Sequence, residues 1–472
     1  MKTRLTAFSM LLLTATAMAA PQVDRVLVRQ QWPWSHDVRI EYVVSGASAP
    51  AEVSFTFRNA GTTLVVADDS ALKGDAKYAG NGTHVVTFNP RELFGPAAPV
   101  EYTAFSVEVT LGAEVANMGD KLYRVVDLDT GSVTDLQRAD FFNGKCGEFV
   151  TNYTDIASGY RTDIDDVFIW TDVTNNPIYR TSKLVLRRIP AMDEDWMMGT
   201  NKNGLSLGST TGNSTLATPH LVKLTSDYYI GVFPVTQMQY KKLTGSLGGS
   251  GGTSSTSYNN FTNATLHPEH ESYPVYGVSY NTFRGTTKDW TIDGHDVDGD
   301  SYLGKLRAKV GGAIAFDMPT EAQWEFASRG GNFTDPLYNG KSYGQSNLKE
   351  IGWCQDNSAT NESGTVYYIL HVVGGKPPNA YGLYDTLGNI NEWCLDWSNG
   401  GDHTWTSKTE PEVDPEGIPK ASATFSAGGV GMHIIKGGSY GEPRTVMHSG
   451  YRSKKYANIE GATGLRVCCP AD

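Results

Sequence analysis

Thiol groups are the most reactive side chains of this sequence, and five cysteines occur in it. An odd number forbids complete pairing within the chain, so we expect mainly buried thiols, with room for one disulfide. Cys468 and Cys469 are adjacent. Because neighbouring side chains of a strand point to opposite faces, we expect these two sulfurs to pack in the interior rather than to form a redox or metal site.

Other patterns for catalysis are sparse. The sequence has neither the glycine-rich loop ending in Gly-Lys-Ser/Thr that holds phosphates nor a His-Glu-x-x-His helix for zinc. Its 10 histidines are scattered without the spacing of metal ligands. No enzyme class follows from these residues alone.

Three helices can be placed by their start signals. Thr236 and Thr320 are each followed three residues later by glutamine, which is the capping-box arrangement. After Thr320, Trp324 and Ala327 fall on one face, and Gly330 supplies a stop. We expect a third helix to begin near Asp300 or Ser301.

The N-terminal part alternates apolar and polar residues in short runs. Period-two runs separated by Gly, Pro, Asn and Asp turns are typical of a β-sandwich, and we predict an immunoglobulin-like one over residues 21–112. We treat residues 113–182 as a connector. The predicted strands are Val26–Val28, Val38–Val44, Val53–Phe57, Leu64–Val66, His84–Phe88 and Phe105–Val109.

The overall composition indicates a turn-rich chain that contains β-structure. The sequence of 472 residues has 51 glycines, 11% aromatic and 19% charged residues, which indicates two or three domains that contain β-structure rather than a helical bundle. Together with the helices placed above, we expect an α+β fold class. The formal net charge of −12 would repel a phosphate backbone, so we expect no nucleic-acid partner.

Residues 1–20 have the features of a signal peptide. Lys2 and Arg4 precede an apolar run through Leu11–Leu13, and small residues precede Pro21. The run is shorter than the ~20 residues of a membrane span, and no other segment reaches that length. We therefore expect an exported protein, periplasmic or extracellular, without a membrane span.

Ordered phrases in the last three-fifths of the chain resemble the formylglycine-generating-enzyme family, also called sulfatase-modifying factors. They occur in the family's order between about Lys183 and Asp472. The resemblance implies a C-type-lectin-like fold over residues 183–472. The phrases are Tyr228–Gly231, Val235–Gln237, Tyr273–Val275, Met318–Glu325, Asn379–Asp385, Gly388–Trp393, Lys436–Tyr440 and Gly464–Val467.

The resemblance implies one Ca²⁺ site in residues 385–392. The matching positions are the side chains of Asp385 and Glu392, with backbone carbonyls of Gly388 and Ile390. Calcium prefers six to eight hard oxygen ligands, which this set could begin to supply. The alternative is that the two acids only cap turns.

Catalytic members of the family carry two cysteines after the Gly-Gly-Ser-aromatic phrase, and these bind Cu(I). In this sequence the two positions fall at Glu442 and Met447. A carboxylate is too hard for Cu(I), and one thioether is a weak neutral ligand, so we expect no copper. The resemblance places Ser439, Tyr440, Glu442, Arg444 and Met447 along the family's substrate groove. We expect Arg466 to bridge backbone carbonyls.

Three functions remain open. The chain is expected to be a non-oxidase binding or structural module, because the cysteine pair is replaced and a β-sandwich is added. The alternatives are a formylglycine-generating oxidase and a lectin-like binder with a diversified surface at Gly441–Gly461. The partner would be a protein or a glycan. The three functions stay open because fold alone does not fix function.

Overall fold

The computed structural model describes residues 20–30, 35–99, 102–145, 149–150, 169–191, 194–199, 219–249, 260–288, 296–330, 348–362, 364–399 and 410–471. The predicted signal peptide, apart from Ala20, lies outside them, as does Cys146. The chain divides into two compact units. The N-terminal unit comprises residues up to 120 and 137–146, and the C-terminal unit comprises residues 121–136 and 147 onward.

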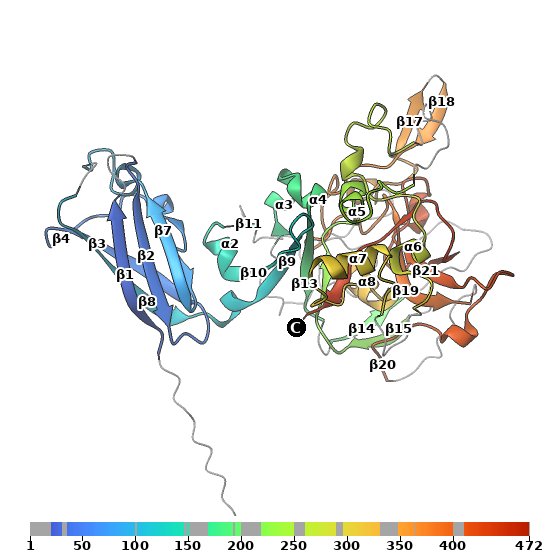
Figure 1. The fold of residues 1–472 in the computed structure, drawn as a ribbon, viewed down its shortest axis with the longest axis horizontal. Helices are drawn as coiled ribbons and strands as arrows, with labels where there is room; N and C mark the ends of the chain where they lie inside the picture. Colours follow the sequence, from blue (N-terminus) through green and yellow to red (C-terminus); the bar gives the residue numbers. More distant parts are fainter. Residues whose placement is uncertain are drawn as a thin grey trace, which may run out of the picture. The chain divides into compact units, whose positions relative to one another are not determined.

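The N-terminal unit contains two antiparallel sheets around one core (Figure 1). Val38, Ile40, Val86 and Phe88 of the first sheet share that core with Phe57 and Val109 of the second. The first sheet has the order β1 (Gln22–Gln30), β2 (Val38–Ser45), β7 (Gly82–Phe88), β5 (Lys73–Gly74), and the second joins β4 (Thr62–Thr63), β3 (Ala51–Asn59), β6 (Tyr78–Ala79) and β8 (Phe105–Glu114). Its immunoglobulin-like type stays a prediction.

One predicted strand of this unit is absent. Leu64–Val66 follows the two-residue strand β4 without strand pairing. Val65 is 82% exposed, so this apolar run does not contribute a buried strand. The unit also includes α1 (Pro90–Leu93) and α2 (Arg138–Phe142). Asn143, just after α2, accepts hydrogen bonds from the backbone N–H groups of Lys77 and Tyr78, both at 3.0 Å, and so anchors α2 to β6.

The segment that we treated as a connector supplies strands to the C-terminal unit. In the five-stranded sheet, β9 (Lys121–Asp127) lies between β10 (Val133–Gln137) and β13 (Lys183–Ile189), followed by β16 (Tyr228–Gly231) and β24 (Cys468–Pro470). Residues Leu122–Val126 are all buried, so the run has no exposed face and lacks the period-two signal of a half-buried strand. The C-terminal unit therefore begins well before Lys183.

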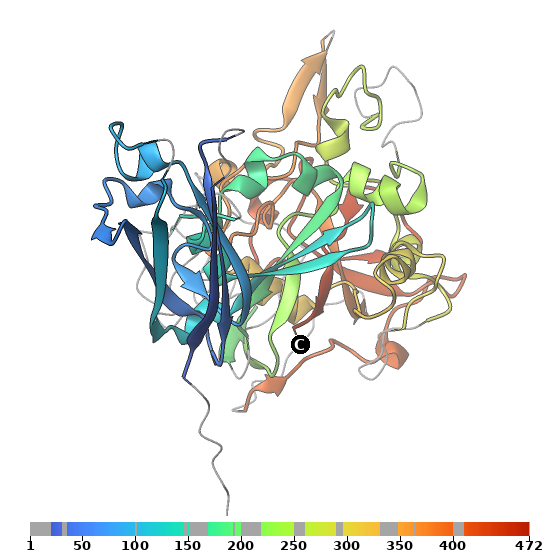
Figure 2. The ribbon, with the colours of Figure 1, turned by 60° about the vertical axis from the view of Figure 1, so that its left-hand side comes forward.

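Two further sheets belong to the C-terminal unit. The sheet of β22 (Ser453–Tyr456), β21 (Met432–Lys436), β19 (Asn391–Ser398) and β23 (Thr463–Gly464) has a fully buried strand in β19. The other sheet joins β14 (Glu194–Met198), β15 (His220–Leu224) and β20 (Glu412–Val413). The hairpin of β17 (Ala359–Glu362) and β18 (Thr365–Tyr368) projects from this unit in both views (Figures 1 and 2). A short pair joins β11 (Phe149–Val150) to β12 (Ile169–Trp170).

The three predicted helix starts are confirmed. Helices α5 (Gln237–Thr244) and α8 (Glu321–Ser328) both carry complete capping boxes at Thr236 and Thr320. Helix α7 (Tyr302–Lys309) begins after Ser301, whose hydroxyl accepts from the N–H of Gly304. The short helices are α3 (Asp172–Asn175), α4 (Ile178–Thr181), α6 (Tyr280–Arg284) and α9 (Leu348–Ile351). Among the described residues, no helix is both long enough and apolar enough to cross a membrane.

Candidate functional site

Residues 385–392 form a tight turn that leads into β19. Asp385, Gly388 and Asn389 all have positive φ angles, of 53°, 81° and 62°. Only glycine fits at position 388, because a Cβ there would lie 2.2 Å from the carbonyl oxygen of Trp353. The Asn389 side chain bonds both the N–H and the carbonyl of His371, each at 3.1 Å. These contacts fix the backbone of the predicted calcium segment.

Glu392 is engaged by donors from two other elements. Arg466 contacts both of its carboxylate oxygens, with Nη2–Oε1 at 2.7 Å and Nε–Oε2 at 2.9 Å. The indole N–H of Trp324 in α8 donates to Oε2 at 2.6 Å. All three side chains are buried. The bidentate guanidinium neutralises the carboxylate, and together with the indole it fills three of its roughly four lone-pair sites.

Arg466 also donates to three backbone carbonyls. Its Nη1 lies 2.8 Å from the oxygen of Gly231 and 3.0 Å from that of Val232, and its Nη2 lies 2.8 Å from that of Tyr384. The expectation that Arg466 bridges carbonyls is therefore confirmed. Its pairing with Glu392, 74 positions away, carried no local signal in the sequence.

Asp385 has different surroundings. Its carboxylate accepts from the N–H of Gly374 at 2.7 Å and, at 3.3 Å, from Nδ2 of Asn389. Burial raises the pKa of Asp385 to about 6 despite these hydrogen bonds. No basic side chain of the described part of the chain forms an ion pair with it.

The four residues that the sequence analysis assigned to calcium do not fit one site in this arrangement. The carboxylate of Asp385 has lone pairs to offer a cation, but Glu392 would have to give up Arg466, which carries a positive charge of its own. Across the described ranges, no cluster of three His, Cys, Asp or Glu side chains could hold a metal ion.

The second predicted region lies directly against the first. The N–H of Gly388 donates to the carbonyl of Gly437 at 2.8 Å, and that of Tyr440 donates to the carbonyl of Asn389 at 3.0 Å. Gly437 and Gly438 both have positive φ and make this approach possible. The two regions, which the sequence analysis treated as separate sites, therefore form one connected structure.

Glu442 connects the two regions through its side chain. Its Oε2 accepts from the hydroxyl of Ser439 at 2.9 Å and from Nδ2 of Asn391, in β19, at 2.8 Å. Asn391 was missed by the sequence analysis, although it stands inside a recognised phrase. Residues 437–441 also fit the letters Gly-x-Ser-x-Gly, but the Ser439 hydroxyl is buried and donates to a carboxylate. That arrangement does not prepare a serine nucleophile.

The remaining predicted groove residues do not share one surface. Met447 is 0% exposed and packs in an apolar cluster with Leu348, Ile351, Cys354 and Leu387. Tyr440 is buried with its ring centroid 5.4 Å from that of Phe261. Arg444 instead lies at the surface, where its Nη1 pairs with Asp356 at 3.1 Å.

The described cysteines are buried thiols. They are Cys354, Cys394, Cys468 and Cys469. Cys468 belongs to the core cluster that contains Trp196, and Cys469 to the one that contains Trp393, so the adjacent sulfurs point to opposite faces as predicted. Burial raises the pKa of the Cys354 thiol, and it raises those of Cys394 and Cys468 well above the ordinary value. These thiols are therefore poor sources of thiolate.

A buried charge network lies behind the predicted groove. In α8, Glu325 pairs with Lys436 at 2.9 Å and with Arg329 at 2.5 Å. Glu321 pairs with Arg452 at 2.8 Å. Lys436 also lies over the ring of Trp324, whose N–H bonds Glu392. The network and the Glu392–Arg466 pair are thus linked through Trp324.

Comparison with known proteins gives a family match over the same part of the chain. A family described as "Sulfatase-modifying factor enzyme 1-like domain" matches residues 196–470. The formylglycine-generating enzyme of Thermomonospora curvata is 32% identical over 113 residues, which are 24% of this chain and 37% of that protein. The bovine enzyme of the same name is 33% identical over 116 residues, or 24% and 29% of the two chains.

The matched part thus spans only about a third of the length of these relatives. Among solved structures, the Treponema denticola variable protein 1 is 22% identical, with 61% of this chain and 96% of that chain covered and a TM-score of 0.42.

Proposed function

Because this chain belongs to the sulfatase-modifying factor enzyme 1-like domain family, we propose that its C-terminal unit is a non-oxidase member that acts as a binding module. The observation that carries the proposal is the pair of side chains at the positions of the family's copper-binding cysteines. Glu442 is hydrogen-bonded to Ser439 and Asn391, and Met447 is enclosed in an apolar cluster.

Cu(I) needs soft ligands that can reach it. The carboxylate of Glu442 is a hard ligand, and the thioether of Met447 is neutral and enclosed. Cys354 lies in the same cluster as Met447, but burial raises the pKa of its thiol. The local chemistry therefore supports a site without copper.

Two other functions are alternatives to this proposal. A formylglycine-generating oxidase is favoured by the names of the relatives, whose match covers about a third of their length. A lectin-like binder with a diversified surface would use residues 441–461. Export and a protein or glycan partner remain part of the proposal. One calcium ion also remains part of it, with Asp385 and the carbonyls of Gly388 and Ile390 as ligands and without Glu392, which is engaged by Arg466.

Copper binding tests the proposal directly. We expect the purified chain to retain no stoichiometric Cu(I) against a competing chelator, because no thiolate pair is available at positions 442 and 447. The double variant Glu442→Cys/Met447→Cys should gain Cu(I) affinity, whereas the matched control Glu442→Ser/Met447→Ser should not. A competition titration followed by absorbance measures all three.

The proposal would be contradicted if the unaltered chain retained stoichiometric Cu(I) and if Met447→Leu or Cys354→Ser abolished that retention. Met447→Leu keeps the volume of the apolar cluster nearly constant. Cys354→Ser keeps the volume but buries a hydroxyl, so its circular dichroism spectrum is compared with that of the unaltered chain before the titration is interpreted.

A further inference from the structure

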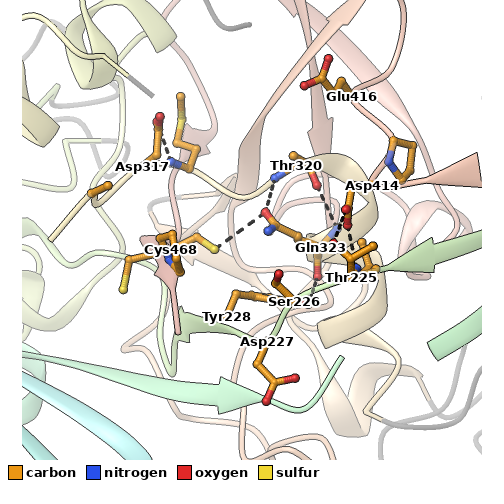
Figure 3. A pocket seen from close by; sticks show the side chains of 16 residues that line it. Thr225, Ser226, Asp227, Tyr228, Asp317, Thr320, Gln323, Asp414, Glu416 and Cys468 are labelled. Carbon is orange, nitrogen blue, oxygen red and sulfur yellow. Dashed lines mark hydrogen bonds between the residues drawn. The ribbon is translucent and has the colours of Figure 1, made fainter. Parts of the chain in front are cut away.

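A second candidate site lies in a cavity of about 280 Å³ in the C-terminal unit (Figure 3). It lies where the turn after β15, the start of α8, the segment after β20 and strand β24 meet. None of the predicted groove or calcium residues lines it. Pockets for drug-sized ligands run from about 300 to 1,000 Å³, so this cavity suits a single side chain or a small molecule.

One part of the lining is apolar. Leu224 of β15, Met318 of the segment before α8 and Pro470 of β24 contribute side chains. Cys468 stands beside them, with its sulfur 3.9 Å from Oε1 of Gln323. Such a wall favours an aliphatic segment of a ligand, because its burial removes apolar area from water.

The opposite part of the lining is polar. Gln323 uses its Oε1 to accept from the N–H of Thr320 at 3.0 Å, and its Nε2 has no hydrogen-bond partner within the described chain. The hydroxyl of Ser226, on the exposed turn, likewise makes no hydrogen bond to a described residue. Both groups stand at the cavity in Figure 3. They leave hydrogen-bonding capacity for a ligand.

Asp414 supplies a negative charge at this polar part. Its carboxylate accepts from the N–H of Thr225 at 2.9 Å and from the Thr225 hydroxyl. Within the described ranges, no Lys, Arg or His side chain lies at ion-pair distance from it. The other two aspartates of the lining differ, since Asp227 pairs with Arg188 at 2.9 Å and Asp317 with Arg284 at 3.1 Å.

We propose that this cavity binds an aliphatic cation, whose alkyl stem lies along Leu224 and Met318 and whose ammonium or guanidinium group meets Asp414. The cation is either a small free amine or the side chain of a lysine or arginine in a protein partner. This inference names a ligand class for the binding module proposed above, and it rests on that proposed function. The binding of the cation itself depends only on the cavity. The copper test can fail while this one succeeds, and the reverse.

The experiment titrates the full chain with three probes under calorimetry. n-Pentylamine represents the free amine, N-acetyl-lysine N-methylamide represents the protein side chain, and 1-pentanol is the uncharged analogue. We expect both cations to bind more tightly than pentanol, and more weakly as salt is added. Binding of pentylamine alone would assign a free amine, and binding of both would assign a side chain as well.

The test variant is Asp414→Asn. Asp414 has a φ of 42°, a conformation that asparagine tolerates, and an amide oxygen can still accept from Thr225. We expect the cations to bind about tenfold more weakly or worse. The matched control is Asp195→Asn, which removes the same charge from an exposed position of strand β14, outside the cavity lining, and should leave binding unchanged.

A second variant, Ser226→Trp, should block the cavity mouth from an exposed position and abolish binding even if Asp414→Asn folds poorly. The proposal is overturned if neither cation binds, if pentanol binds as well as the cations, or if folded Asp414→Asn binds like the unaltered chain.

Discussion

Replacement of Arg466 by leucine is expected to lower the free energy of unfolding of the C-terminal unit by about 3–5 kcal/mol. The substitution leaves the charge of Glu392 buried without its cation. It also removes the donor to the carbonyls of Gly231, Val232 and Tyr384. Chemical denaturation, followed by a probe that reports on the C-terminal unit alone, measures the loss.

A surface ion pair provides the control. Arg444→Leu breaks the pair with Asp356, in which both side chains are well exposed, and should cost no more than about 1 kcal/mol.

Glu392→Gln should lower the melting temperature equally in calcium and in chelator, because its carboxylate serves Arg466 rather than a metal. A loss seen only in calcium would show that Glu392 is a calcium ligand and that the ion-pair interpretation is wrong.

Replacement of Lys436 by methionine should have a comparable effect, about 3–5 kcal/mol. Lys436 is fully buried and contacts Glu325 at 2.9 Å and Glu321 at 3.4 Å. Methionine keeps the volume, so the loss reports on charge rather than packing. The double variant with Glu325→Gln should recover part of the stability, and a double-mutant cycle measures the coupling.

The same pair predicts a dependence on pH. Burial alone would raise the pKa of Glu325, but Lys436 and Arg329 hold it down at about 2, against an ordinary value of 4.5. A carboxylate with a lowered pKa stabilises the folded state above pH 4.5, and this contribution, about 3 kcal/mol, is lost as the pH falls toward 2. Lys436→Met should therefore weaken the stability of the chain at neutral pH and flatten its decline in acid. An unchanged acid limb would contradict this account of the network.

Local signals in the sequence predicted the helices well. The capping boxes at Thr236 and Thr320 gave the starts of α5 and α8, because the residues that satisfy the first N–H groups stand within four positions of one another. Strand β9 was missed because it is buried on both faces, and Leu64–Val66 was wrongly predicted because Val65 and Val66 are exposed.

The candidate site depends on residues far apart in the sequence. Asp385 and Glu392 stand seven positions apart, and the resemblance to the family implied that they share a cation. The contact that decides the role of Glu392 comes from Arg466, and Glu442 is held by Asn391 from another strand. Such pairings follow from the tertiary fold, and the sequence pattern alone does not contain them.

The central claim, that this chain is a family member without the oxidase reaction, is tested most directly on a Cys-x-Pro-x-Arg peptide with copper and O₂ supplied. A formylglycine-generating enzyme that carries the cysteine pair, assayed in parallel, shows that the conditions support the reaction. We predict that mass spectrometry will detect no conversion of the peptide cysteine to formylglycine above the rate in buffer with copper. Conversion above that rate by the unaltered chain, lost in Met447→Leu, would contradict the claim.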